Sequence, residues 1–284
     1  MIYRMNGKIP KIVLDSVNYT YPSGTKALLD VNLNINKSEL VGIMGKNGAG
    51  KTTLIRTLNG LIRPSSGRIF INGRNINDQS IAQLSKKIGI IFQNPNHQLF
   101  SNTVYEEIEF SLKSIYNEKE LVRKKIEETL TLFDFQRYRN RSPLNLSGGE
   151  KKKLALASIM CRDPEIIVFD EPTLGQDAKE IEFFINLLRK EQKLGKTIII
   201  ITHNVEFTIE FIPRTILMSN GKILADGPSK NILTNEKIIE QASLILPQVS
   251  QFKIALNKLG IKTPDNLYKE DDMIDFLSTY LGSK

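Results

Sequence analysis

The amino-acid sequence predicts an α/β protein with a mostly parallel sheet that helices cover on both faces, together with an antiparallel β part. Short apolar runs of strand length alternate along the chain with segments of helical spacing, which is the pattern of a parallel sheet. One of these runs ends in a glycine-rich turn that opens a helix. The pair Asn220-Gly221 between two further runs is typical of a β-hairpin, so we also expect antiparallel pairing.

The order of the elements follows from the hydrophobic pattern. Turn residues, such as those at 22–24 and 64–67, separate the first strands. We expect strands at residues 11–19, 33–35, 40–44, 68–72, 88–92, 166–169, 197–201, 214–219 and 222–226. Apolar residues at helical spacing predict helices at residues 51–61, 118–133, 178–192 and 228–234.

Residues 94–161 differ from the strand-rich parts on either side, because helical patterns dominate there. We interpret this stretch as a helical subdomain inserted into a main domain that spans residues 1–235. An amphipathic tail follows, and we expect residues 236–284 to form a small helical domain of their own. Its expected buried positions are all apolar: Leu244, Leu246, Phe252, Leu256 and Leu259.

Composition limits the class of protein. The chain has 284 residues, of which 40% are hydrophobic and 25% are charged, and this is typical of one large or two modest globular domains. The longest aliphatic run, residues 198–201, is far shorter than the roughly 18 apolar residues of a membrane helix. Residues 1–11 lack the apolar segment of a secretory signal, so we expect a soluble, cytosolic protein. The single cysteine, Cys161, excludes a disulfide framework and a cysteine-based zinc site.

The net charge of +8 is unevenly distributed along the chain. Residues 1–235 carry +9 and residues 236–284 carry −1. A basic surface can bind nucleic acid, phosphate groups or an anionic membrane face. A lysine-rich, solvated surface gives the same balance, so the charge alone does not decide among these partners.

A phosphate-binding loop is the first motif with a defined chemistry. Residues Gly45-Lys46-Asn47-Gly48-Ala49-Gly50-Lys51-Thr52 fit the pattern G-x-x-x-x-G-K-[ST], and they join an apolar strand to a helix as this motif requires. The glycines let successive N–H groups point at phosphate oxygens, and the helix N-terminus adds partial positive charge. Lys51 suits the β- and γ-phosphates, and the hydroxyl of Thr52 suits Mg²⁺. The loop therefore predicts ATP or GTP binding.

Polar residues follow three of the predicted strands: Asp170 and Glu171, then His203, and also Gln93. Because the carboxyl ends of parallel strands form one edge of a sheet, we expect these residues near the phosphate-binding loop. Asp170 would hold Mg²⁺ through water, and Glu171 would hold the attacking water in line or accept its proton. His203 would contact the γ-phosphate, and Gln93 would touch Mg²⁺ or water. His97 has no such context, and we expect it at the surface.

A second glycine motif, Leu146-Ser147-Gly148-Gly149-Glu150, precedes a helix rich in lysine and alanine. Ser147 and Glu150 have the spacing of a capping box, and a Ser-Gly-Gly helix start is also a good anion site. No obvious arrangement within one chain lets both glycine motifs hold the same nucleotide. We therefore expect a two-fold dimer, in which each ATP is held by the loop of one subunit and the Ser-Gly-Gly turn of the other.

The order of these motifs resembles the ATP-binding subunits of ABC transporters over roughly residues 11–226. The resemblance implies the P-loop NTPase fold of ABC ATPases, with ATP and Mg²⁺ as ligands and ATP hydrolysis as the activity. It extends the loop to Thr53, makes Tyr21 the aromatic that stacks on adenine, and makes Gln93 the Q-loop glutamine. It identifies Asp170 and Glu171 as the acidic strand end and His203 as the switch histidine. The signature is implied to be Ser147, Gly148, Gly149 and Glu150, and the D-loop aspartate to be Asp177. The signature and the D-loop aspartate would act on the other subunit's ATP.

A narrower resemblance is to the energy-coupling factor (ECF) ATPases of the cobalt type. It rests on residues 93–100 (QNPNHQLF) and 103–110 (TVYEEIEF), and on residues 244–260, which are similar to the C-terminal dimerisation domain of those subunits. The resemblance implies an importer for a vitamin or a transition-metal ion (cobalt or nickel), with this chain at the cytoplasmic face of the cell membrane. The implied partners are a second ATPase subunit, identical or different, a transmembrane T component that docks near Gln93, and a substrate-binding S component.

The sequence departs from the family pattern in its signature and its D-loop. Glu150 replaces the usual Gln, Lys153 stands where Arg is frequent, and the D-loop reads Leu174-Gly175-Gln176-Asp177 where Gly-Leu-Asp is common. The catalytic positions are complete, so we expect an active enzyme. The changed D-loop would suit one member of a heterodimeric pair.

Other functions fit parts of the pattern. A conventional ABC importer subunit for sugars, amino acids or phosphate shares the motifs, but residues 93–110 and the tail argue against it. A soluble ABC ATPase of DNA repair or the ribosome suits the basic charge. Such proteins usually have a long coiled-coil insertion or two tandem cassettes, so we expect no nucleic-acid partner. A non-catalytic regulator is disfavoured because the catalytic set is complete.

Overall fold

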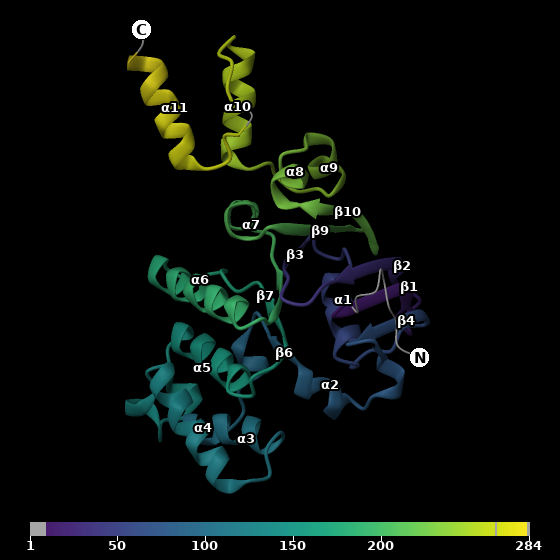
Figure 1. Ribbon diagram of the computed structural model, residues 1–284, viewed down its shortest axis with the longest axis vertical. Coiled ribbons are helices and arrows are strands. Elements are labelled where there is room, and N and C mark those ends of the chain that lie inside the picture. The colour runs from purple at the N-terminus through teal and green to yellow at the C-terminus, as the bar shows by residue number, and fades with distance from the viewer. Residues whose placement is uncertain (1–9, 265, 283–284) are drawn as a thin grey trace.

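Two sheets form the centre of the computed structural model, which describes residues 10–264 and 266–282 (Figure 1). The larger sheet contains β3 (Leu40–Met44), β6 (Ile88–Ile91), β7 (Ile166–Asp170), β8 (Thr197–Ile201), β9 (Arg214–Ser219) and β10 (Lys222–Pro228). The smaller sheet contains β1 (Ile12–Thr20), β2 (Lys26–Ile35), β4 (Ser66–Ile71) and β5 (Arg74–Asn75).

Strand pairing confirms the predicted fold class. The larger sheet has the order β10-β9-β3-β8-β7-β6, and every neighbouring pair from β9 to β6 is parallel. The edge strand β10 pairs antiparallel with β9, as the Asn220-Gly221 hairpin predicts. The smaller sheet has the order β2-β1-β4-β5 and is antiparallel throughout.

Helices cover the larger sheet and extend beyond it at both ends (Figure 1). The α-helices are α1 (Lys51–Leu58), α2 (Ile81–Lys87), α3 (Val104–Lys113), α4 (Lys119–Leu132), α5 (Gly148–Met160), α6 (Ala178–Lys193), α7 (Val205–Phe211), α8 (Ser229–Leu233), α9 (Glu236–Gln241), α10 (Gln248–Lys258) and α11 (Glu270–Gly282). Short 3₁₀ turns occur at η1 (Ile76–Asp78), η2 (Pro95–His97), η3 (Gln136–Tyr138) and η4 (Pro143–Asn145). Among the helices in the described ranges, none is long and apolar enough to cross a membrane.

The core lies on both faces of the parallel sheet, because successive side chains of a strand point to opposite faces. In β7, Ile166 and Val168 pack with α1 and the antiparallel sheet, whereas Ile167 and Phe169 pack with the helices of the other face. The central strands are therefore apolar at nearly every position. This double burial explains why short apolar runs were sufficient to locate β3 and β8 in the sequence.

The stretch predicted as a helical subdomain contains α3, α4, α5 and the three 3₁₀ turns η2, η3 and η4. Helix α3 packs against α4 and α5, and α5 in turn contacts β6 of the parallel sheet. Figure 1 shows α3 and α4 at one end of the molecule, with α5 between them and the sheet. Helix α5 therefore links this helical part to the sheet, and Phe133 at the end of α4 also packs against Phe183 of α6.

The C-terminal helices form a separate small core of Val249, Leu256, Leu267 and Met273. In Figure 1, α10 and α11 stand apart from the sheets at the other end of the molecule, while α9 packs beside α8. Two expected buried positions are wrong, since Phe252 is 47% exposed and Leu259 is 77% exposed. The reason is that α11 covers α10 from one side, so part of the apolar face of α10 stays uncovered within one chain.

One predicted helix boundary is also wrong. The helix expected over residues 51–61 ends at Leu58, and Leu61 is 56% exposed. Gly60 takes a positive φ of 76° and donates its N–H to Thr57 O at 3.2 Å, which ends the helix in a tight turn. Helices α2 and α7 were not predicted, since each has only seven residues and little periodicity to detect.

Cys161 caps the C-terminal end of α5 and lies partly buried, with its Sγ 3.3 Å from Ser158 O. Burial raises the pKa of its thiol to about 12. The thiol is therefore almost entirely protonated at neutral pH.

An ion cluster around Arg214 joins strands of both sheets. Its guanidinium donates two hydrogen bonds of 2.7 Å to Asp226 of β10, one of 2.8 Å to Glu39 and one of 3.0 Å to Asn34 O of β2. The hydrogen bonds to Asp226 raise the pKa of Arg214, so its charge is permanent. Because Arg214 and Glu39 are only partly exposed and four hydrogen bonds fix the guanidinium, this cluster should contribute more to stability than a surface pair.

We therefore expect Arg214→Met to lower the free energy of unfolding by about 2 kcal/mol, since Glu39 and Asp226 then lose their shared partner. Urea denaturation followed by circular dichroism measures this change. Arg68→Met is the matched control, because Arg68 pairs with Asp15 at the surface with 61% of its side chain exposed. It should cost about 1 kcal/mol or less. Equal effects of the two substitutions would contradict the assigned role of the cluster.

Candidate functional site

The loop between β3 and α1 has a backbone that needs glycine at its two ends. Gly45 has φ +143°, and a Cβ there would lie 2.2 Å from Met218 O. Gly50 has φ +103°, and a Cβ there would lie 2.5 Å from Ala27 O. Between them, Lys46, Asn47 and Gly48 are exposed. The loop is thus closely packed at both ends and open in the middle, which is the shape of an anion cradle.

Lys51 lies at the base of this loop with 9% of its surface exposed. Its Nζ donates to Gly45 O at 2.5 Å and to Lys46 O at 3.1 Å. Burial lowers the pKa of Lys51, and the nearby carboxylates of Glu171 and Asp170 partly oppose that shift. The ammonium is held by neutral carbonyls beside two acids, so an added anion would be drawn to it.

The acidic strand end lies where the sequence predicted it. Asp170 is the last residue of β7, and the N–H of Glu171 donates to Ile201 O of the neighbouring β8 at 2.8 Å. Glu171 has φ +50°, a left-handed conformation that turns the chain sharply away from the sheet. Burial raises the pKa of Asp170, and the like charge of Glu171 raises it further. Two carboxylates therefore stand at one sheet edge with little water around the first.

His203 and Glu171 are brought together by the order of the strands. His203 follows β8, and its Nδ1 lies 2.8 Å from Oε1 of Glu171. The tautomer that carries its proton on Nδ1 donates to this carboxylate. Thr202 N donates to Ile43 O of β3 at 3.3 Å, so the ends of β3, β7 and β8 are joined by hydrogen bonds.

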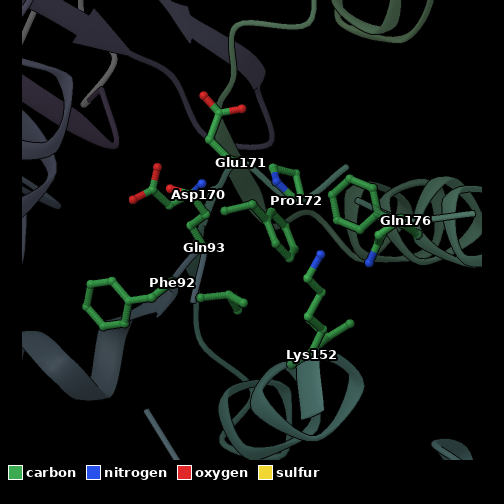
Figure 2. Close-up of a pocket in the computed structure, with 11 residues that line it drawn as sticks. Phe92, Gln93, Lys152, Asp170, Glu171, Pro172 and Gln176 are labelled. Carbon is green, nitrogen blue, oxygen red and sulfur yellow. The ribbon is translucent and has the colours of Figure 1, made fainter. Parts of the chain in front are cut away.

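Gln93 follows β6 and lies next to the acidic strand end. Gln93, Asp170 and Glu171 line a small cavity at the ends of β6 and β7 (Figure 2). The opposite wall of that cavity carries Lys152 of α5. The predicted neighbourhood of Gln93 with Asp170 and Glu171 is therefore present in the structure, and His97 is exposed as expected.

Tyr21 lies on the other side of the loop, at the end of β1. Its hydroxyl is 2.9 Å from Thr53 Oγ1 in the first turn of α1, and its ring packs edge-on against Tyr19 with a centroid distance of 4.9 Å. Thr52 is exposed beside it. The structure thus places Tyr21 at the rim of the phosphate-binding loop, and its stacking on adenine stays a prediction.

The signature lies apart from the phosphate-binding loop. Ser147 accepts from Glu150 N at 3.2 Å, and Glu150 accepts from Ser147 N at 2.8 Å, so the predicted capping box is present. The Ser147 N–H and the Tyr138 hydroxyl lower the pKa of Glu150, which keeps it ionised. Ser147, Gly149 and Glu150 line a second cavity of about 390 Å³ that has no residue of the phosphate-binding loop on its walls.

Asp177 of the D-loop caps α6, where it accepts from Glu180 N at 2.8 Å. Like the signature, it has no contact with the phosphate-binding loop among the hydrogen bonds of the described residues. The residues predicted to act on the other subunit's ATP therefore stay together near α5 and α6, away from Lys51. Within one chain, the predicted site is assembled only in part.

Sequence reasoning missed three polar side chains that organise this region. Gln98 donates to Ala155 O at 2.6 Å, Glu107 is 2% exposed and accepts from Phe100 N and Ser101 N, and Lys152 donates to Leu174 O. Gln98 and Lys152 contact main-chain atoms that are distant in sequence, for which residue type and spacing carry no signal. For Glu107 a partial signal existed, because it lies in the first turn of a helix capped by Thr103.

The arrangement fits a nucleoside triphosphate with Mg²⁺. The cradle is open at its centre, a buried ammonium lies at its base, and the groups at its mouth are oxygen donors: Thr52, Asp170 and Gln93. Hydroxyl, carboxylate and amide oxygens are the donors that Mg²⁺ prefers. Glu171 is the carboxylate left free of that set, and His203 holds it in place.

Comparison with known proteins shows similarity to ABC transporter proteins. The sequence profile of the family described as ABC transporter matches residues 28–174. A putative ABC transporter ATP-binding protein of Methanosarcina acetivorans is 39% identical over 268 residues, which are 94% of this chain. The match covers 44% of that relative's own length, so the chain spans less than half of it.

Other relatives match over most of their length. The energy-coupling factor transporter ATP-binding protein EcfA of Methanothermobacter thermautotrophicus is 35% identical over 94% of this chain and 86% of its own. Among solved structures, cbiO1 from Clostridium perfringens, part of the ABC transporter complex cbiONQ, is 32% identical with a TM-score of 0.72. That likeness covers 86% of this chain and 99% of cbiO1.

The raised pKa of Asp170 has a consequence for stability. The folded chain binds this proton more tightly than the unfolded chain, so the ionised carboxylate destabilises the fold. The penalty is complete above the raised pKa and disappears as the pH falls below the ordinary value of 3.8. We expect Asp170→Asn to raise the Tm of the nucleotide-free chain by about 2 °C at neutral pH, with a smaller gain in acid.

Thermal melts monitored by circular dichroism check this expectation, with the exposed Asp78→Asn as control. Asp78→Asn should leave Tm unchanged. Addition of ATP and Mg²⁺ should reverse the order and favour the parent chain, because Asp170 is then needed for binding. A lower Tm for Asp170→Asn without nucleotide would show that its carboxylate is already compensated.

Proposed function

The chain belongs to the ABC transporter ATP-binding family and, within it, to the energy-coupling factor ATPases, and on that premise we propose that it hydrolyses ATP to drive uptake of a small nutrient through membrane partners. The observation that carries this proposal is the complete catalytic set at one sheet edge: Lys51, Asp170, Glu171 and His203, with Gln93 beside them. One part of the predicted site is not joined to the phosphate-binding loop, since the cavity lined by the signature has no residue of that loop on its walls.

A second ATPase subunit supplies the missing part in this proposal. The glycine turn at Ser147 and the D-loop at Asp177 would meet the ATP that is bound to the other subunit's loop. Both begin helices in which a capping box holds the N-cap and N3 N–H groups, so the N–H groups between them, such as those of Gly148 and Gly149, would meet the anion. Each of two ATP molecules then lies between two subunits, which are either copies of this chain or this chain with a sister ATPase. The exposed apolar residues Phe252 and Leu259 support a role of residues 236–284 in dimerisation.

The chemistry assigned to each side chain follows from its position. ATP supplies the γ-phosphoryl group, and Mg²⁺ offsets its negative charge. Lys51 and the loop N–H groups would orient the phosphates, and Thr52, Gln93 and Asp170, the last through water, would hold the metal. Glu171 orients the attacking water or accepts its proton, and His203 keeps that carboxylate at the sheet edge.

Docking of a transmembrane T component is supported by an aromatic pair beside the Q-loop. Phe100 is 64% exposed and Phe110 is 56% exposed, and their rings pack edge to face with centroids 4.7 Å apart. Two adjacent exposed phenylalanines on one surface are typical of a protein contact. Gln98 fastens this segment to α5, so a movement of the docked partner would reach the signature helix directly. A separate S component would select the vitamin or the transition-metal ion.

The first test concerns Glu171. Glu171→Gln keeps the size of the side chain but removes the carboxylate, so we expect ATP binding to persist and kcat to fall by about 100-fold or more. ATP-bound dimers should then accumulate in light scattering coupled to gel filtration. Glu165→Gln is the control, because this carboxylate lies at the other end of β7 and pairs with Lys11. Hydrolysis by Glu171→Gln near the parental rate would refute the role of Glu171.

The second test concerns the aromatic pair. Phe100→Ser combined with Phe110→Ser should abolish co-purification with a co-expressed T component, because the apolar contact is lost. The Tm of the isolated variant should stay within about 2 °C of the parent, since both rings are already exposed. Leu132→Ser, on an equally exposed position of α4, should keep the complex. An intact complex in the double variant would place the docking surface elsewhere.

A further inference from the structure

A cleft separates α5 from the segment 171–177 that follows the acidic strand end. The small cavity beside Gln93 and the larger one of about 390 Å³ share Lys152, Leu156, Gln176 and Phe184 on their walls. The two cavities are therefore parts of one cleft. Figure 2 shows Lys152 reaching from α5 across this space toward the segment that carries Pro172 and Gln176.

One polar contact spans the cleft. The ammonium of Lys152 donates to the carbonyl oxygen of Leu174. Within the described residues, this is the one hydrogen bond between α5 and residues 171–177. Lys152 lines both cavities, so its contact with Leu174 joins the two segments where side chains do not fill the space between them completely.

The carbonyl that Lys152 holds belongs to the same turn as Glu171. Leu174 N donates to Glu171 O at 3.3 Å, and Gln176 N donates to Thr173 O at 3.3 Å. Glu171 enters this turn in a left-handed conformation, with φ +50°. A shift of the Leu174 carbonyl therefore rotates the backbone from which the Glu171 side chain projects.

The cleft also contains a second acceptor within the same segment. The Oε1 atom of Gln176 is buried and has no hydrogen-bond partner among the described residues. A lysine ammonium has three donors, and Lys152 uses one of them on Leu174. When α5 moves, Lys152 can keep the segment attached by donating to Gln176. Gln176 is one of the residues at which the D-loop departs from the family pattern, and it therefore lies in the same contact region.

We propose that Lys152 is a positioning residue that sets the Glu171 carboxylate from the signature helix, through the carbonyl of Leu174. The inference rests on the proposed ATPase function and adds to it the side chain that links α5 to the hydrolytic carboxylate. Gln98 fastens a later turn of α5, at Ala155 and Ser158, to the segment beside the aromatic pair. The two contacts together form a polar connection from the docking surface to Glu171.

The test uses the full chain with ATP and Mg²⁺. Lys152→Met keeps the aliphatic stem and removes the donor, so kcat should fall about tenfold while KM for ATP changes by less than about twofold. Lys152→Arg retains a donor and should keep kcat within about twofold of the parent. Lys151→Met is the control, because this neighbouring side chain makes no hydrogen bond or ion pair in the described structure, and its kcat should be unchanged.

A double-mutant cycle separates positioning of Glu171 from a general structural effect. In the Glu171→Gln background, Lys152→Met should cause no further loss of the residual rate, because the group that it positions is already gone. An unchanged kcat for Lys152→Met, or a tenfold loss that persists in the Glu171→Gln background, would overturn the inference.

Hydrogen exchange tests the contact without using hydrolysis. The amides of residues 171–177 should exchange faster in Lys152→Met than in the parent or in Lys152→Arg. Equal exchange in all three chains would overturn the inference even if the parent hydrolyses ATP. If the parent does not hydrolyse ATP, the proposed function fails, while faster exchange in Lys152→Met still supports the contact.

Discussion

A buried ammonium that faces two carboxylates is the interaction on which the rest of the site depends. Lys51 is held by two backbone carbonyls at the base of a glycine loop, and the Asp170 and Glu171 carboxylates lie near enough to affect its pKa. Burial disfavours the charged form of both groups, since it lowers the pKa of Lys51 and raises the pKa of Asp170. The ligand-free site therefore stores electrostatic strain that a bound phosphate group and its metal would relieve.

The parallel sheet is what brings these charges together. Hydrogen bonds align the ends of β3, β7 and β8, so a lysine after the first, an acid pair after the second and a histidine after the third reach one edge. The remaining groups of the proposed ATP site lie on α5 and α6, beyond the cleft. A protein built in this way has one rigid half of a site and one half that is attached through few polar contacts, which suits opening and closing around a ligand.

Much of this structure was predictable from sequence, and the physical reason differs from part to part. Strands β3 and β8 were located to the residue, because strands covered on both faces are apolar at nearly every position, and β9 because the Asn220-Gly221 turn marks its end. The loop at Gly45, the acids at Asp170 and the cap at Ser147 were found because each function needs fixed residue types at a fixed local spacing. Side-chain contacts between distant segments were not found. Lys152 gives no sign in the sequence that its partner is the carbonyl of Leu174, and the exposure of Phe252 depends on what α11 leaves uncovered.

The thiol of Cys161 has a practical consequence for biophysical work on this protein. It is the chain's single cysteine, and a protonated sulfur enclosed at the end of α5 is a poor nucleophile toward maleimides and iodoacetamides. The native polypeptide should therefore react very slowly with thiol-directed dyes and spin labels. A cysteine engineered at an exposed glycine outside the proposed site, such as Gly282, would take up the probe selectively, without prior removal of the natural one.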